Sequence, residues 1–248
     1  MSLQVNAILW LMKRIDGRAY DELRQVNIAL GYQRFAEGST LIDVGSTRVL
    51  CAVSVEERIP RFLRGEGIGW ITAEYAMLPR STHQRTRRET SRPRGRSQEI
   101  RRLIGRSLRT ALDLEELGER TIILDCDVLQ ADGGTRTASI SGAYVALALA
   151  LQSLEDVGLV KPGVLTTDVA AISLGLVEGQ LLLDLCYEED SAATADFNIV
   201  MTGEGQMIEV QGTAEGEPFD REAMDAVLDL AEKGISHMLD FQKQVLKR

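Results

Sequence analysis

The amino-acid sequence predicts a mixed α+β fold, in which mostly antiparallel sheets pack against buried helices. Short apolar or alternating runs, rich in β-branched residues and separated by turns that contain glycine, are typical of strands. Three longer segments have the periodicity of helices. The order is strands, helix, strand, helix, strands and helix, which differs from the regular alternation of a parallel α/β protein. Since 44% of the 248 residues are apolar, the chain can build a substantial core.

The first group of predicted strands is divided by turn signals at residues 37–39 and 44–46, each of which contains glycine and serine. A glycine-rich segment at 61–69 has the spacing GxGxG, but no helical pattern follows it. This spacing excludes a dinucleotide-binding loop of the Rossmann type. The predicted strands of this group are 26–33, 40–44, 48–57 and 71–78.

The second half of the chain alternates between strands and two long helices. One helix is apolar nearly all round and should therefore be buried centrally, whereas the last helix is amphipathic. Glu178-Gly179 is a hairpin signal between two strands. No linker is long enough to divide the chain, so residues 12–248 are predicted to form a single domain. The predicted elements are strands 121–129, 169–177, 180–188, 197–202 and 206–211, and helices 138–154 and 220–247.

Residues 1–11 are interpreted as an extension, because Met12 is followed by basic residues and could be the native start. The apolar run at 7–12 is too short to span a membrane, and no membrane association is expected. The three cysteines, Cys51, Cys126 and Cys186, lie far apart in apolar runs. They are typical of buried, reduced thiols in a cytoplasmic protein. No CxxC spacing occurs and only two histidines are present, which argues against zinc sites and Ser/His catalysis.

The most unusual feature of the composition is a cluster of eleven arginines between Arg80 and Arg109, in a chain whose net charge is −9. Arginine is favoured where a planar group with several donors must bind phosphate. The cluster continues into a predicted helix, where Arg102 and Arg106 lie beside the apolar face. This arrangement favours a surface that binds nucleic acid. A solvated, flexible linker remains the alternative for its first part.

The motif Gly133-Gly134-Thr135-Arg136-Thr137 lies between a predicted strand and the start of the buried helix. Paired glycines allow backbone N–H groups to approach an anion, and the helix terminus adds partial positive charge. Thr135 adds a hydroxyl and Arg136 a fork of donors, so the motif predicts a site for one phosphate group. The Walker pattern is absent. An ordinary turn with a threonine cap is the alternative.

Two aspartates, Asp190 and Asp196, bracket a run of small residues near the predicted end of a strand. Carboxylates together with substrate phosphates commonly hold Mg²⁺, although an acidic turn on the surface would have the same spacing. No protein nucleophile is evident. The nucleophile should therefore come from solution, as water or inorganic phosphate, and the separate phosphate site favours phosphate.

Six segments of the chain carry a resemblance to a known family. In order along the sequence they are RIDGR at 14–18, GWITAEY at 69–75, MLPRSTH at 77–83, LDCDVLQADGGTRTAS at 124–139, EDSAA at 189–193 and EVQGTAEGEPF at 209–219. From about Met12 to the C-terminus, the chain resembles the bacterial ribonuclease PH family. Only the segment 89–96 differs, being about two residues shorter than the family pattern.

The resemblance implies a phosphorolytic 3′-to-5′ exoribonuclease, a tRNA nucleotidyltransferase that trims tRNA precursors and other RNA 3′ ends and releases nucleoside 5′-diphosphates. Inorganic phosphate would be the co-substrate, and Mg²⁺ or a similar divalent ion the cofactor. The fold would be related to a domain of a ribosomal protein, and the assembly would be a homohexamer built as a trimer of dimers. A catalytically silent, RNA-binding subunit of an exosome-like ring is the alternative.

The resemblance also implies roles for single residues. Arg136 belongs both to the phosphate site and to the catalytic residues, and the two aspartates would be catalytic and bind the metal. The implied phosphate-binding residues are Arg96, Gly134, Thr135 and Arg136, the implied catalytic residues Asp190, Asp196 and Arg136, and the implied RNA-binding residues Arg80, Arg85 and Arg88, to which the helix adds Arg102 and Arg106.

Overall fold

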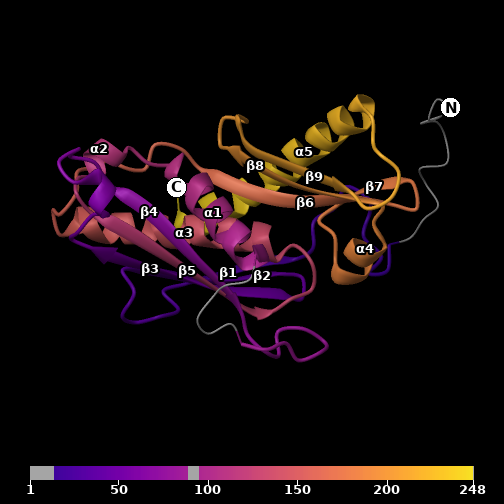
Figure 1. Ribbon diagram of the computed structural model, residues 1–248, viewed down its shortest axis with the longest axis horizontal. Coiled ribbons are helices and arrows are strands. Elements are labelled where there is room, and N and C mark those ends of the chain that lie inside the picture. Colours follow the sequence, from indigo (N-terminus) through magenta and orange to yellow (C-terminus); the bar gives the residue numbers. More distant parts are fainter. Residues whose placement is uncertain (1–13, 89–94, 248) are drawn as a thin grey trace.

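The computed structural model describes residues 14–88 and 95–247 (Figure 1). The predicted extension at residues 1–11 and most of the shortened segment at 89–96 lie outside the described residues. The described chain forms two β-sheets with a long helix between them, and the expectation of a mixed α+β fold with mostly antiparallel strands is confirmed.

The first sheet has five strands in the order β1-β2-β3-β5-β4. All neighbours pair antiparallel except β4 and β5, which are parallel. A parallel pair requires a crossover, which is provided here by helix α1 (Gly95–Arg109) and the short α2 (Leu114–Leu117). The strands are β1 (Val26–Leu30), β2 (Gly38–Val44), β3 (Thr47–Glu56), β4 (Trp70–Met77) and β5 (Thr121–Gln130).

The second sheet has four antiparallel strands in the order β7-β6-β8-β9. The hairpin predicted at Glu178-Gly179 is confirmed, with φ of 50° and 79° at these two residues. The helix after β9 is capped by Asp220, whose carboxylate accepts the backbone N–H of Ala223. The elements are β6 (Val169–Val177), β7 (Gln180–Leu183), β8 (Ala195–Thr202), β9 (Met207–Ala214) and helix α5 (Arg221–Leu246).

Helix α3 (Thr135–Asp156) lies between the two sheets, as its apolar composition predicts (Figure 1). It contacts β2 and β3 of the first sheet and β6 of the second. By length and composition this helix could cross a membrane, but 83% of its most apolar window is buried inside the protein. Its first turn follows the glycine pair of the predicted phosphate motif, so the core of the protein positions that motif.

One predicted strand is wrong in its second part. The strand expected at 180–188 ends at Leu183, and Tyr187–Ala192 forms the short helix α4. Asp184 breaks the strand with a left-handed φ of 53°, and its carboxylate accepts a hydrogen bond from the backbone N–H of Arg24. The partner of Asp184 is thus far away in the sequence, so the local pattern could not reveal the break. Asp190 consequently lies on a helix.

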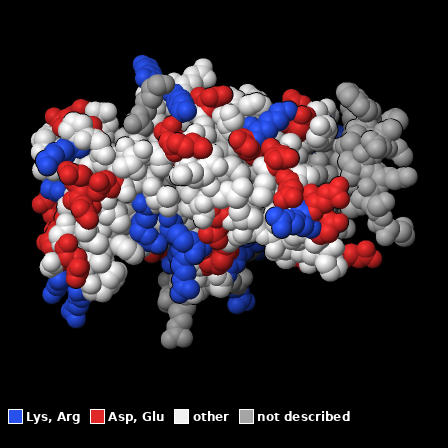
Figure 2. Space-filling view, turned by 90° about the horizontal axis from the view of Figure 1, so that it is seen from above, with Lys and Arg blue, Asp and Glu red and all other residues white. Residues whose placement is uncertain are grey.

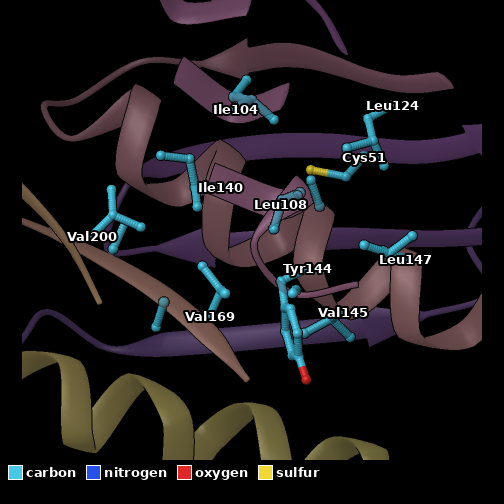
Figure 3. Packing of buried hydrophobic residues seen from close by; sticks show 14 of the residues in the cluster. Cys51, Ile104, Leu108, Leu124, Ile140, Tyr144, Val145, Leu147, Val169 and Val200 are labelled. Atoms are coloured by element: carbon cyan, nitrogen blue, oxygen red, sulfur yellow. The ribbon is translucent and has the colours of Figure 1, made fainter. Parts of the chain in front are cut away.

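The buried apolar residues form one continuous cluster that includes both sheets. Figure 3 shows Leu124 of the first sheet, Leu108 of α1, Tyr144 of α3 and Val169 of the second sheet in the same packed region. Because protein interiors are closely packed, a loss of packing at one place in this cluster weakens the residues around it. We therefore propose that residues 12–248 fold as one cooperative unit.

This proposal predicts a single unfolding transition. Far-UV and near-UV circular dichroism should report the same midpoint, and the calorimetric enthalpy should equal the van't Hoff enthalpy. The protein concentration must be held fixed, because subunit assembly would also shift the midpoint. Two separated transitions, one for each sheet, would contradict the proposal.

Candidate active site

The residues that the sequence predicts for phosphate and for metal come together in one pocket of about 380 Å³. The pocket lies between the start of α3, the helix α4 and the face of the second sheet. The predicted residues in its lining come from the start of α1, the start of α3 and the segment from α4 into β8, and β6 and the end of β9 also contribute. The predicted residues that line it are Arg96, Gly134, Thr135, Arg136, Asp190 and Asp196.

The glycine pair forms one end of the pocket. Gly133 and Gly134 have φ of 76° and 64°, which is the left-handed region that favours glycine. A Cβ atom at Gly133 would lie 2.4 Å from the carbonyl oxygen of Leu185, so no larger residue fits there. Gly134 is the N-cap of α3, and the N-terminus of this 22-residue helix lines the pocket. Such a helix terminus attracts anions.

Arg136 lies in the first turn of α3, and its guanidinium donates a hydrogen bond of 2.8 Å to Oε1 of Gln211. It also lies 3.4 Å from Oε1 of Glu99, while Gln211 donates to the same carboxylate at 3.0 Å. The sequence predicted that Arg136 binds a phosphate group, and it did not identify Glu99 or Gln211 as partners. These two side chains hold the guanidinium in place and leave it in contact with the pocket.

Thr135 is supported from the first sheet. Its Oγ1 lies 2.9 Å from the hydroxyl of Tyr75 on β4. Burial raises the pKa of the Tyr75 phenol, so this hydroxyl stays neutral and can both donate and accept. The contact connects the predicted phosphate loop to the end of the first sheet. The conformation of the loop is therefore fixed by long-range packing.

The two aspartates form the other end of the pocket. Burial raises the pKa of Asp190, and the charges of Arg96 and Arg136 oppose that rise. Burial also raises the pKa of Asp196, and the negative charge of Asp190 adds to the effect. Both carboxyl groups are thus less acidic than usual, as is common where carboxylates converge in a reaction site.

A third carboxyl group, Glu215, also lines the pocket and further raises the pKa of Asp196. Glu215 follows β9, within the segment EVQGTAEGEPF that contributes to the family resemblance. Its place is set by backbone hydrogen bonds from Glu215 and Gly216 to the carbonyl of Thr194. No local pattern indicates this contact.

Buried ion pairs hold the two ends of the pocket together. The guanidinium of Arg24 lies 2.6 Å from the carboxylate of Asp184, and it also donates to the backbone carbonyl of Asp132, just before the glycine pair. Arg14 lies 2.6 Å from Glu189, the residue next to Asp190. Burial alone would raise the pKa of Glu189, but the hydrogen bonds from Arg14 and the Cys186 N–H bring it below its usual value.

The predicted RNA-binding arginines lie outside the pocket. Arg80, Arg85 and Arg88 are exposed on the segment that follows β4, and Arg102 and Arg106 are exposed on α1. Arg106 is paired with Glu209 of β9 at 2.9 Å. Figure 2 shows basic side chains gathered near the middle of one face of the molecule, while acidic side chains are spread over the rest of that face.

The donor set of the pocket fits a divalent cation only in part. Among residues 14–88 and 95–247, no group of three or more His, Cys, Asp and Glu side chains is arranged to hold a metal ion. Mg²⁺, however, is usually held by one or two carboxylates together with substrate phosphates and water. Asp190 and Asp196 can therefore provide the protein ligands, provided that substrate oxygens complete the coordination.

Comparison with protein families gives two adjoining matches. Residues 22–151 match domain 1 of the 3′ exoribonuclease family, and residues 168–234 match domain 2. A ribonuclease PH of Bacillus pumilus is 58% identical over 235 residues, covering 94% of this chain and 97% of that protein. A ribonuclease PH of Moorella thermoacetica is 59% identical over 237 residues, covering 95% of both.

Two solved structures have the same fold. The crystal structure of rice (Oryza sativa) Rrp46 superposes with a TM-score of 0.77 at 20% identity, covering 94% of this chain and all of that one. The Archaeoglobus fulgidus exosome with RNA bound to the active site gives a TM-score of 0.76 at 24% identity, covering 92% of both chains. At this level of identity the likeness concerns the fold alone.

Proposed function

Because the chain belongs to the 3′ exoribonuclease family, we propose that the pocket at the start of α3 is the site at which it cleaves RNA with phosphate. The protein is a phosphate-dependent 3′-to-5′ exoribonuclease, or tRNA nucleotidyltransferase, that processes RNA 3′ ends. Inorganic phosphate is its co-substrate. One observation carries the assignment of the site. The glycine loop for which the sequence predicts phosphate binding and the carboxyl groups of Asp190 and Asp196, whose pKa burial raises, line a single pocket.

Phosphate binding is the role of Arg96, Gly134, Thr135 and Arg136. The two guanidinium groups and the start of α3 attract the anion, and the Thr135 hydroxyl adds a donor. In the reaction, an oxygen of hydrogen phosphate bonds to the phosphorus of the last phosphodiester. The bond from this phosphorus to O3′ of the preceding nucleotide breaks, and the proton of hydrogen phosphate is transferred to O3′. The products are a shortened RNA with a 3′-hydroxyl and a nucleoside 5′-diphosphate.

Asp190 and Asp196 would bind Mg²⁺ or a similar ion, which when bound neutralises charge on the reacting phosphates. The protein's own arginines also neutralise charge on the reacting phosphates. Arg96 and Arg136 lie beside the pocket, where positive groups held in place stabilise charge that develops in the transition state. Arg136 cannot move freely because Gln211 and Glu99 hold it, so little reorganisation is needed during the reaction.

The exposed arginines would hold the body of the RNA. Changing Arg80, Arg85 and Arg88 together to alanine should weaken tRNA binding. It should also reduce the slope of log affinity against log salt by about 2–3, since this slope falls by about 0.7–0.9 for each phosphate that the protein no longer neutralises. Filter binding or fluorescence anisotropy over a series of salt concentrations measures this slope.

A matched control removes three exposed arginines elsewhere on the first half of the chain, and it should leave the slope nearly unchanged. An unchanged slope in the first variant would show that the segment after β4 is not the RNA surface. The control changes are Arg34→Ala, Arg48→Ala and Arg58→Ala.

The ring assembly is also a proposal. The solved structures of the same fold include an archaeal exosome core, and a homohexamer built as a trimer of dimers is the closed ring that we expect here. Cytoplasmic location is expected as well, since Cys51, Cys126 and Cys186 are all free and buried.

The function is tested by incubating the protein and Mg²⁺ with a tRNA that carries a short 3′ extension, in the presence and absence of inorganic phosphate. Nucleoside diphosphates should appear only when phosphate is present. Monophosphates released without phosphate would indicate a hydrolase. Tight RNA binding without any release would favour the catalytically silent subunit.

A further inference from the structure

A row of polar side chains crosses the second sheet below the pocket. Ser173 on β6 is the register partner of Asn198 on β8, and Asn198 is the partner of Gln211 on β9. Register partners lie on the same face of a sheet, and Asp196 shares that face because it lies two residues before Asn198. The face with this row is therefore the one that carries the catalytic carboxyl group.

The side chains of two members of this row have no hydrogen-bond partner among the described residues. Ser173 and Asn198 are 7% and 8% exposed, and both line the pocket. The Ser173 hydroxyl is buried without a hydrogen bond. The side chain of Asn198 makes no hydrogen bond to any described residue, and its amide is open to the pocket. Gln211 differs, because Arg136 and Glu99 occupy its amide. Buried polar groups are rarely left unpaired, so the Ser173 hydroxyl, together with the neighbouring Asn198 amide that faces the pocket, indicates a place for a ligand.

The position of Asn198 indicates which ligand it contacts. On one side, its neighbour Ser173 adjoins the phosphate loop, since the Ser173 hydroxyl lies 3.3 Å from the place where a Cβ of Gly134 would be. On the other side, Asp196 lies two residues away on the same strand. Asn198 thus lies between the end of the pocket assigned to the attacking phosphate and the end that carries the carboxyl groups. The phosphorus of the scissile phosphodiester, which is transferred from O3′ to the attacking phosphate, should therefore lie in this space.

We propose that Asn198 is a catalytic residue whose Nδ2–H group donates a hydrogen bond to a non-bridging oxygen of the scissile phosphodiester. This role rests on the proposed function of the pocket. As the phosphate oxygen bonds to phosphorus and the bond to O3′ breaks, charge is redistributed over the non-bridging oxygens. An amide that faces the pocket and has no other partner among the described residues stabilises that charge without first breaking a hydrogen bond to the protein.

The test compares Asn198→Ala with the wild-type protein, with Asn27→Ala as the matched control, since Asn27 is exposed on β1. Asn198→Ala should lower kcat about a hundredfold, the loss typical of one such donor. KM for phosphate and Kd for RNA should stay within about threefold, since the contact strengthens only in the transition state. Asn27→Ala should match the wild type.

A second readout separates this role from a structural one. RNA is supplied with an Rp or an Sp phosphorothioate at its last linkage. The assay uses Mn²⁺ in place of Mg²⁺, since Mn²⁺ tolerates sulfur as a ligand and so reduces the difference that the metal itself would cause. The wild type should then cleave one isomer more slowly because sulfur accepts the amide hydrogen bond poorly, and Asn198→Ala should lose that difference. Asn198→Asp, which keeps the shape but replaces the donor with an acceptor, should lose at least as much activity and serves if the alanine variant does not fold.

The remaining outcomes would contradict either the role of Asn198 or the function of the pocket on which it rests. Wild-type turnover in Asn198→Ala, or an unchanged difference between the two isomers, would refute the contact with the scissile phosphodiester. A loss confined to a higher KM for phosphate would place Asn198 on the attacking phosphate, and this too would overturn the proposal. If the wild type itself released no diphosphates with phosphate present, the function of the pocket would be wrong, irrespective of Asn198.

Discussion

Replacing Arg136 with alanine should lower phosphate-dependent turnover by about 10²–10³-fold, which is the scale of one lost group that stabilises developing charge. Arg136 is the charged member of the loop at the start of α3, and both Gln211 and Glu99 hold its guanidinium at the pocket. The RNA-binding arginines lie elsewhere, so Kd for RNA should change little. Arg136→Lys keeps the charge without the fork of donors and should recover only part of the activity.

The measurement is the steady-state rate of diphosphate release as the phosphate concentration is varied, together with RNA binding by anisotropy. Arg48→Ala is a suitable control, because Arg48 is exposed and paired with Asp43 outside the pocket. Turnover retained in Arg136→Ala would refute the assignment of the phosphate site.

The change Asp196→Asn should abolish most activity and stabilise the protein at the same time. Turnover should fall by about 10²–10⁴-fold, the range for a carboxyl group that acts directly in a reaction. Burial and the charge of Asp190 raise the pKa of Asp196, so the ionised carboxylate destabilises the folded protein at neutral pH. An amide avoids this penalty, and the melting temperature should therefore rise.

The stabilisation by Asp196→Asn should depend on pH. Since the folded protein holds the proton of Asp196 more tightly than the unfolded chain, the wild type regains stability as pH falls through the raised pKa toward the ordinary value of 3.8. The gap in melting temperature between Asp196→Asn and the wild type should be widest at neutral pH and close in acid. EDTA must be present, because a bound cation would favour the carboxylate. A lower melting temperature in the variant at neutral pH would contradict this account.

Elements with a strong periodic pattern could be predicted from the sequence. The nearly uniform apolar run of α3 led to the correct position between the sheets, and the Glu178-Gly179 hairpin followed from turn chemistry alone. The parallel pairing of β4 with β5 had no local signal, since it depends on the crossover through α1. Helix α4 was missed because distant arginines, Arg24 and Arg14, stabilise the turn before it and its third residue.

In the site, too, residues with a local sequence signal could be predicted, and residues placed by distant contacts could not. Loop chemistry and charge led to the residues on either side of the pocket, and the family resemblance added weight to the two aspartates. Glu215 and Asn198, which line the pocket, and Glu99 and Gln211, which hold Arg136, could not be found in this way. Each is brought to its place by strand pairing or helix packing. Their sequence neighbourhoods are those of ordinary surface or strand residues.

The most direct test of phosphorolysis in this pocket follows the phosphate atom itself. The protein and Mg²⁺ are incubated with unlabelled 3′-extended tRNA and radiolabelled inorganic phosphate, and the released nucleotides are separated. The label should appear in the β-phosphate of nucleoside diphosphates, and Arg136→Ala should form almost none of this product. Unlabelled nucleoside monophosphates as the only product would mean that water is the nucleophile and that the protein is a hydrolase.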